Sequence, residues 1–231
     1  GEELVPPQYG KVFISIKPRN GDFVPNLIKE NIKRDLRRYS VAGIVPEILD
    51  LKYLFIETNS KVYYNTNLAP SASFVSTKVQ RDLTSYAESS ELNKYGARFK
   101  YSRFLKVIDS SHESVTSNIT TVEMRRDLRL ATSEVAEYAI DFGNEFHVRS
   151  MNGFNIRTSA FRVLNINTDV YLYDVPDSTA EKGQISLFSL NEGSSTPVIQ
   201  RRNIGTINYK TGRITLDPIN IVSGKTKDNV Q

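Results

Sequence analysis

The pattern of apolar residues changes near residue 133, and this change restricts the possible folds more than any other feature of the chain. Before it, apolar residues recur at both strand and helix spacing. After it, short β-rich runs alternate with turn clusters such as MNG, EKG and KTG. The change predicts an α+β protein with two parts: an N-terminal α/β layered region over residues 1–130 and a mostly antiparallel β region over 131–231. We expect the boundary to be accurate only to ten residues or more.

The first part opens with a strand–helix pattern. Val12, Ile14 and Ile16 alternate with other residues, which predicts a strand. Asp22 suits the N-cap of a following helix, with Pro25 in its first turn. Gly43 is expected to end this helical region. The predicted buried stripe of the helix consists of Val24, Ile28, Ile32, Leu36 and Tyr39.

The pattern then repeats. Residues 48–58 carry large apolar side chains on both faces, which predicts a strand in the centre of a sheet, and residues 61–65 predict a short strand. A second helix is expected from Ser73 to about Leu92, and its buried stripe consists of Val75, Val79, Leu83 and Tyr86. Residues 98–109 fit a helix and a strand equally, whereas residues 119–130 predict a strand. The order strand, helix, strand, strand, helix, strand is compatible with a split βαβ arrangement.

The second part predicts an antiparallel sheet or sandwich. Tyr209 to Arg213 has the pattern of a tight hairpin turn, in which Gly212 supplies the positive φ. The polar end of the chain, residues 223–231, is expected to fray. The runs expected as strands are 135–142, 144–150, 154–164, 168–175, 184–190, 196–202, 204–210 and 213–219.

Cysteine is absent, which excludes disulfides, thiolate catalysis and thiolate metal sites. A chain without disulfides fits folding in a cytosol. No apolar run approaches the ~18 residues of a membrane-spanning helix. The acidic, proline-bearing N-terminus does not resemble a secretory signal. The chain has no starting methionine, and we expect it to be a fragment of a longer protein.

Residues 109–113 read Asp-Ser-Ser-His-Glu, which are the residue types of nucleophilic active sites. Ser110 or Ser111 with His112 would make a hydrolase. Triad members usually come from separate elements, however, and no G-x-S-x-G elbow surrounds these serines. We therefore predict a polar turn in which Asp109 or Ser110 bonds nearby backbone amides. No catalytic residue is predicted.

The sequence predicts no metal, cofactor or phosphate site either. His112 and His147 are the only histidines and are far apart in sequence. Asp174 and Asp177 lack the oxygen spacing of a calcium loop, and Pro176 between them favours a turn with two solvated carboxylates. No glycine-rich phosphate loop occurs. Asn118 opens an Asn-Ile-Thr glycosylation pattern, without a secretory signal to support it.

The net charge is +4 and it is uneven. Residues 1–115 hold 17 Lys and Arg against 13 Asp and Glu, whereas residues 116–231 hold 13 of each. Part of the surplus lies on the predicted helix segment 29–38. An alternative function is therefore a binding module for nucleic acid or for an acidic protein through this basic helix, although such a run is more often a solvated helix face. Its cations are Lys29, Lys33, Arg34, Arg37 and Arg38.

Three stretches resemble a known family. They are PPQYGKVFISIKP (6–18), RFLKVIDSSHESVTSNITTVEMRRDLR (103–129) and GTINYKTGRITLDP (205–218). Together they are similar to the baseplate wedge proteins of contractile-tailed bacteriophages, of the T-even gene-product-six type within the broader baseplate J-like family. None of the three is a catalytic signature. The resemblance therefore depends on their combination.

The resemblance implies a structural virion protein, corresponding to the C-terminal portion of a larger wedge subunit. It implies a homodimer whose copies link neighbouring wedges into the inner baseplate ring around the hub, with other wedge proteins as partners. It also implies a late protein located in the tail baseplate, assembled in the host cytoplasm and without enzymatic activity. It supplies no site residues, and the interaction residues stay unassigned.

Overall fold

The computed structural model describes residues 10–18, 23–41, 43–128, 130–132, 134–191, 193 and 196–225. The chain divides into two compact units, Gly1–Tyr53 and Leu54–Gln231. Within the described ranges, every helix is too short or too polar to span a bilayer.

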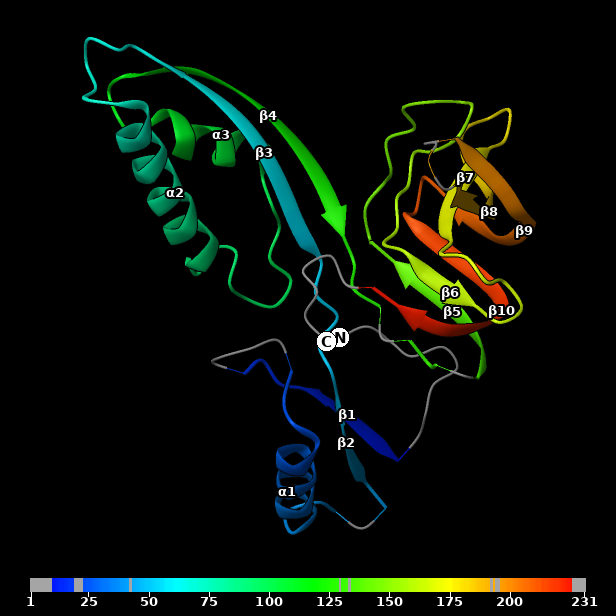
Figure 1. Ribbon diagram of the computed structural model, residues 1–231. Helices are drawn as coiled ribbons and strands as arrows, with labels where there is room; N and C mark the ends of the chain where they lie inside the picture. Colours follow the sequence, from blue (N-terminus) through cyan, green and yellow to red (C-terminus); the bar gives the residue numbers. More distant parts are fainter. Residues whose placement is uncertain are drawn as a thin grey trace. The chain divides into compact units, whose positions relative to one another are not determined.

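The first unit is a βαβ motif in which β1 (Lys11–Ser15) pairs with β2 (Val45–Leu49) in parallel (Figure 1). The helix α1 (Asn26–Arg37) connects them, since parallel strands cannot be joined by a tight turn. Lys11 Nζ lies 3.0 Å from a carboxylate oxygen of Glu47 on the neighbouring strand. The predicted strand and helix are therefore confirmed.

The start and the buried stripe of α1 differ from the prediction. Pro25 is the N-cap and not a first-turn residue, and Asp22 lies outside the described residues. Of the predicted stripe, Val24 is buried and Ile32 and Leu36 are half-buried. Ile28 and Tyr39 are 48% and 87% exposed. The helix ends at Arg37, before Tyr39, and a sheet of two strands is too narrow to cover a wide helix face.

The second unit begins with a ribbon–helix module, in which β3 (Phe55–Tyr64) and β4 (Val115–Arg125) form an antiparallel pair. Figure 1 shows α2 (Ala72–Glu88) and α3 (Tyr101–Asp109) on one side of this ribbon. The prediction of one central strand over 48–58 is wrong, because residues 50–54 belong to no strand and the run is shared between β2 and β3. A continuous apolar run reports burial, but it does not specify how many strands lie beside it.

Sequence and structure agree closely on α2. Ser71 caps it, since its Oγ accepts a hydrogen bond from the amide of Phe74 at 3.2 Å. The predicted stripe is confirmed: Val75 and Val79 are buried, and Leu83 and Tyr86 pack against the same cluster. The helix stops at Glu88, before the predicted Leu92, because Ser89 is extended.

The sequence fits both a helix and a strand over residues 98–109. In the structure, this segment forms the helix α3 from Tyr101 onward. Phe104 and Ile108, which lie four residues apart on one face, are both buried against α2. The predicted strand over 119–130 is confirmed as far as Arg125. The split βαβ layering is not confirmed, since β1–β2 and β3–β4 form separate two-stranded sheets.

The rest of the second unit is a curled antiparallel sheet. Its strands pair in the order β5-β10-β9-β8-β7, and the short β6 pairs with β10. Phe161 in β6 also exchanges two backbone hydrogen bonds with Val170, next to β7, which closes a small barrel. The mostly antiparallel β region is therefore confirmed. The strands are β5 (Val135–Asp141), β6 (Phe161–Val163), β7 (Tyr171–Pro176), β8 (Lys182–Leu190), β9 (Pro197–Asn208) and β10 (Arg213–Gly224).

β10 contains a proline because its pairing is interrupted there. Its register with β5 shifts between Leu216 and Ile219, so the missing N–H of Pro218 falls at the irregularity. The first part of β10 pairs with β9 and its last part with β6.

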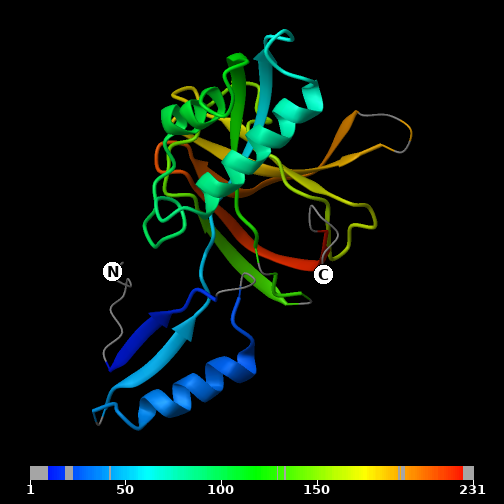
Figure 2. The same ribbon diagram turned by 90° about the vertical axis from the view of Figure 1, so that its left-hand side faces the viewer.

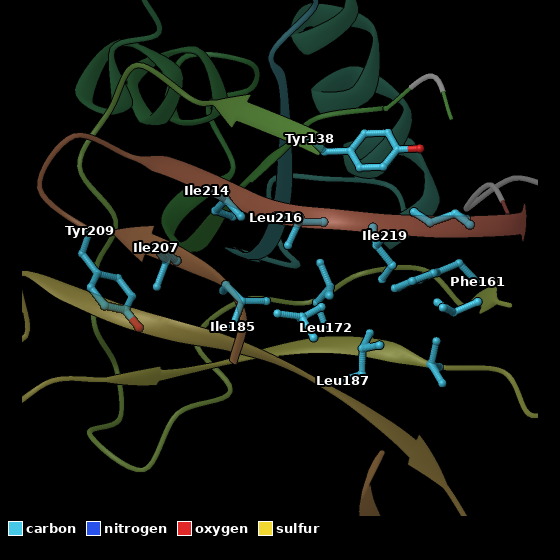
Figure 3. Packing of buried hydrophobic residues seen from close by; sticks show 14 residues of the cluster. Tyr138, Phe161, Leu172, Ile185, Leu187, Ile207, Tyr209, Ile214, Leu216 and Ile219 are labelled. Carbon is cyan, nitrogen blue, oxygen red and sulfur yellow. The ribbon is translucent and has the colours of Figure 1, made fainter. Parts of the chain in front are cut away.

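The core lies inside this barrel. Figure 3 shows Leu172, Ile185 and Leu216 pointing into the space between β10 and β7–β8. Ile185 and Leu187 are completely buried. Alternate residues of each strand supply this interior, as a period of two requires.

Some predicted strands are absent or merged. Residues 144–150 are not a strand, since Asn155 Oδ1 accepts hydrogen bonds from the amides of Arg149 and Ser150 at 2.8 Å. Only Phe161–Val163 of the run 154–164 is extended, whereas runs 196–202 and 204–210 form one strand, β9. The hairpin turn is confirmed, with Gly212 at φ +67°. The fraying predicted for the end concerns residues 226–231, which lie outside the described residues.

Candidate interaction surfaces

The Asp-Ser-Ser-His-Glu stretch forms the end of α3 and the turn into β4. His112 Nδ1 accepts a hydrogen bond from the amide of Ser114 at 3.2 Å and lies 2.8 Å from Ser114 Oγ. Ser111 Oγ donates to the carbonyl of Ile108 at 2.7 Å. Asp109 accepts from the side chain of Asn118 at 2.7 Å.

This geometry is that of a turn closed by side chains. The serine beside His112 is Ser114, which is fully buried, and neither Ser110 nor Ser111. The imidazole also packs edge-on against Phe74 of α2, at 5.3 Å between ring centroids. The prediction that Asp109 or Ser110 accepts a hydrogen bond from a backbone amide is wrong, because the acceptor is His112 Nδ1. Asn118 of the glycosylation pattern lies in β4, half-buried and held by Asp109.

The prediction of two solvated carboxylates at 174 and 177 is wrong for Asp174, which is fully buried. Its Oδ1 accepts from the amides of Asn155 (2.7 Å) and Ile156 (3.0 Å). Its Oδ2 accepts from Asn155 Nδ2 (2.7 Å) and from the hydroxyl of Tyr209 (2.6 Å). β7 continues to Pro176, so Asp174 belongs to a strand and points to the barrel interior. Sequence alone could not reveal this, because its donors come from residues 155, 156 and 209.

Asp174 also affects the ionisation of its partner. Burial, together with the hydrogen bond to Asp174, raises the pKa of Tyr209 well above its ordinary value of 10.0. Asp177 behaves as predicted: it is exposed and accepts from the amide and hydroxyl of Thr179. The hydrogen bond from Thr179 lowers the pKa of the Asp177 carboxyl. These groups stabilise the fold and the turn.

The basic helix does not present its charges as one surface. Lys29 pairs with Asp50, its side chain is only 12% exposed, and Lys33 is half-buried. Arg34 bonds Asn31 of the same helix at 3.1 Å. Arg37 and Arg38 remain exposed. This arrangement does not support the alternative that the helix binds nucleic acid or an acidic protein.

Across the described residues, no group of three or more histidine and acidic side chains is placed to hold a metal ion. A shallow hollow of about 600 Å³ lies over the ends of β7 to β10. It is lined by a mixture of hydroxyl, amide and oppositely charged groups, including Asp177, Lys182 and Arg213. This mixture does not favour one chemical class of ligand.

The first unit leaves much apolar surface uncovered. Within its described residues, only Val24 and Pro46 are buried. Nine large apolar side chains are exposed: Val12, Phe23, Leu27, Ile28, Tyr39, Val41, Ile44, Val45 and Leu49. Parallel sheets normally have both faces covered. This unit is therefore incomplete as a hydrophobic core.

A second apolar group lies outside the barrel, on β7, β8 and the segment before β7, and it is only partly covered: Phe154 is 49% exposed, whereas Tyr173 is buried. Phe154 stacks on Tyr173 with ring centroids 4.9 Å apart, and Phe188 packs edge-on against both rings at 5.5 and 5.8 Å. The period of two in β7 places Tyr171 and Tyr173 opposite Leu172, but no sequence signal identifies Phe154, which lies outside any strand.

Exposed apolar surface in the first unit, a packed β scaffold in the second and the closed turn after α3 are the features expected of a structural protein. The comparisons with known proteins agree. The family described as baseplate structural protein gp6, C-terminal domain I, matches residues 1–49, and C-terminal domain III of the same protein matches residues 52–127. The chain is therefore a structural protein of a phage baseplate.

A curated relative specifies this further. The baseplate wedge protein gp6 of Enterobacteria phage T4 is 31% identical over 172 residues, which are 72% of this chain and 26% of that protein. The chain belongs to the gp6 family of baseplate structural proteins and corresponds to a C-terminal portion. It spans about a quarter of the relative's length.

Proposed function

We propose that this chain is a baseplate wedge protein that forms a homodimer, and that its dimers link neighbouring wedges into the inner ring around the hub of a contractile tail. Its partners are a second copy of itself and other wedge proteins. It acts without enzymatic activity and is a late protein assembled in the host cytoplasm. The membership in the gp6 family and the exposed apolar surface of the first unit support this proposal.

The incomplete core of the first unit is the observation that carries the proposal. Leu27 and Tyr39 are 75% and 87% exposed and belong to the group of nine exposed large apolar side chains, and extensive exposed apolar surface marks protein interaction sites. Burying their apolar surface contributes a stabilising free energy of about 25 cal/mol per Å² removed from water. A partner surface is needed to provide this stabilisation.

A second copy fits this surface because the motif can pair with itself. β1 and β2 form a sheet of only two strands, so each has a neighbour on one edge. A two-fold axis would place the same edge of two copies side by side and would extend the sheet. The same apolar residues would then face each other across the axis.

Sedimentation velocity of the chain over a range of concentrations tests the proposal. We expect a dimer, and we expect the double variant Leu27→Ser, Tyr39→Ser to shift it to monomer. The matched control is Tyr95→Ser, Ile119→Ser, which likewise removes one tyrosine and one aliphatic side chain, each 61% exposed, from the second unit. A strictly monomeric wild type at high concentration, or equal dissociation in both double variants, would contradict the proposed surface.

A further inference from the structure

The barrel carries a partly exposed group of aromatic rings, and the segments that bear or adjoin these rings also carry exposed arginines. We propose that this surface binds an extended, acidic segment of a partner protein that also carries apolar side chains. We name it the aromatic–arginine surface. It consists of Phe154, Tyr171, Phe188 and Ile199 with Arg149, Arg157, Arg201 and Arg202, and Tyr173 lies buried beneath Phe154.

The rings form a continuous group. Tyr171 stacks on Phe188 at 5.4 Å, and Phe188 contacts Phe154 and Tyr173. Ile199 of β9 is the cross-strand partner of Phe188 and is 42% exposed. Phe154 lies at the outer limit of the group, 49% exposed, with one face of its ring on Tyr173.

Phe154 is held in an unfavourable backbone conformation. Its φ is +62°, a region that bulky residues rarely occupy. The neighbours enforce it: a Cβ at Gly153 would lie 2.0 Å from the carbonyl oxygen of Asp174, and Asn155 makes two hydrogen bonds to the buried Asp174 carboxylate. Strain of this kind persists only where surrounding structure imposes it, and it concentrates at binding sites. The fold therefore presents this ring in a fixed position.

The strand beside the rings has an unpaired edge. β10 pairs with β9 only from Gly205 to Asn208, and in the described structure residues 197–203 have β8 as their only strand neighbour. Figure 2 shows this end of the β8–β9 hairpin extending beyond the rest of the sheet. An open edge of this length can hydrogen-bond the main chain of an extended polypeptide.

The charge of this surface has one sign. The four segments that build it (146–158, 170–176, 183–191 and 196–204) contain four arginines and a single acidic residue, the buried Asp174. Arg149, Arg157, Arg201 and Arg202 are all exposed, and among the described residues no ion pair involves them. Arginine binds carboxylates through paired hydrogen bonds. An acidic ligand is therefore favoured, although the second half of the chain is neutral overall.

The observations favour a polypeptide over a nucleic acid. Aromatic rings with arginines also suit single-stranded nucleic acid. The open edge of β9 and the aliphatic Ile199 do not suit a nucleic acid, because bases neither extend a β-sheet nor stack on an aliphatic side chain. The inference does not depend on self-association, since these residues all belong to the second unit and the proposed dimer surface to the first.

The test uses the full chain and a fluorescein-labelled peptide of twelve residues, (Glu-Leu-Glu-Tyr)₃, followed by fluorescence anisotropy. We expect saturable binding that weakens as salt increases. Arg201→Gln with Arg202→Gln should weaken it by roughly fivefold or more. Phe154→Asn should weaken it similarly, and circular dichroism should show that the variant stays folded, because asparagine tolerates positive φ. The matched control, Lys94→Gln with Arg98→Gln, removes the same charge from exposed positions elsewhere and should change nothing.

Three results would overturn the proposal. The first is no binding of the peptide at millimolar concentration. The second is binding that the surface variants and the control reduce equally. The third is tighter binding of a twelve-nucleotide oligothymidine, reduced by the same variants, which would assign the surface to nucleic acid. If circular dichroism shows that the first arginine pair disturbs folding, Arg149→Gln with Arg157→Gln provides the same comparison.

Discussion

Asp174 shows how much of this fold depends on one buried side chain. Asp174→Ala leaves two backbone amides, the Asn155 amide group and the Tyr209 hydroxyl without their acceptor inside the barrel. We expect a loss of about 3 kcal/mol or more in the free energy of unfolding, measured by urea denaturation. Asp177→Ala, at an exposed position three residues away, should change the midpoint little. Equal effects of both substitutions would refute the structural role of Asp174.

The raised pKa of Tyr209 predicts how the stability of the fold depends on pH. Its pKa is raised in the folded state by burial, so above pH ~10 the unfolded chain releases this proton while the folded chain retains it. The contribution is fully present below the ordinary tyrosine pKa and is lost as pH rises above it. We expect the unfolding midpoint of wild type to fall in this range more steeply than that of Tyr209→Phe. Parallel pH profiles for the two proteins would count against this assignment.

At the scale of elements, the ribbon–helix module is stabilised by the contact between α2 and α3. Ile108 of α3 is fully buried in this contact, whereas Ile119 of β4 is 61% exposed on the ribbon. Ile108→Ala should lower the free energy of unfolding by about 2–5 kcal/mol, because it removes buried methylenes and leaves a cavity. Ile119→Ala should cost less than about 0.5 kcal/mol. Chemical denaturation of both variants checks the difference, and similar losses would contradict the packing.

At the scale of the whole molecule, the two units should differ in their ability to fold alone. The second unit contains both hydrophobic clusters, and the first has only Val24 and Pro46 buried among its described residues. A fragment of residues 54–231 should keep a cooperative thermal transition near that of the full chain. A fragment of residues 1–53 should be largely unfolded at low concentration. Nuclear magnetic resonance spectra of both fragments test this, and a dispersed spectrum for 1–53 would refute it.

The division of the chain at residue 130 stays a prediction. The two compact units meet at a different boundary, after Tyr53, which separates the first unit from the rest of the chain. The change of pattern near residue 133 coincides with the change from the ribbon–helix module to the barrel strands, which begin with β5 at Val135. Limited proteolysis of residues 54–231 would decide whether these two parts separate.

The sequence by itself determined the elements whose signal is local. Val75 and Val79 at helical spacing specify the buried side of α2, and Gly212 specifies the β9–β10 turn, because spacing and φ preferences act within a few residues. The resemblance read from three stretches also indicates the correct family without any knowledge of the fold, and the family models match residues 1–49 and 52–127, which contain the first stretch and most of the second. Local chemistry is sufficient for these inferences.

Only the tertiary structure decided which residues meet. It placed Asp174 beside Tyr209, joined β6 to both β10 and Val170, and divided the apolar run 48–58 between two sheets. It also placed Phe154 at positive φ beside Phe188, far along the chain. The physical reason is that burial, strand pairing and strain depend on partners distant in sequence, and a periodic pattern carries no information about which partner will be present.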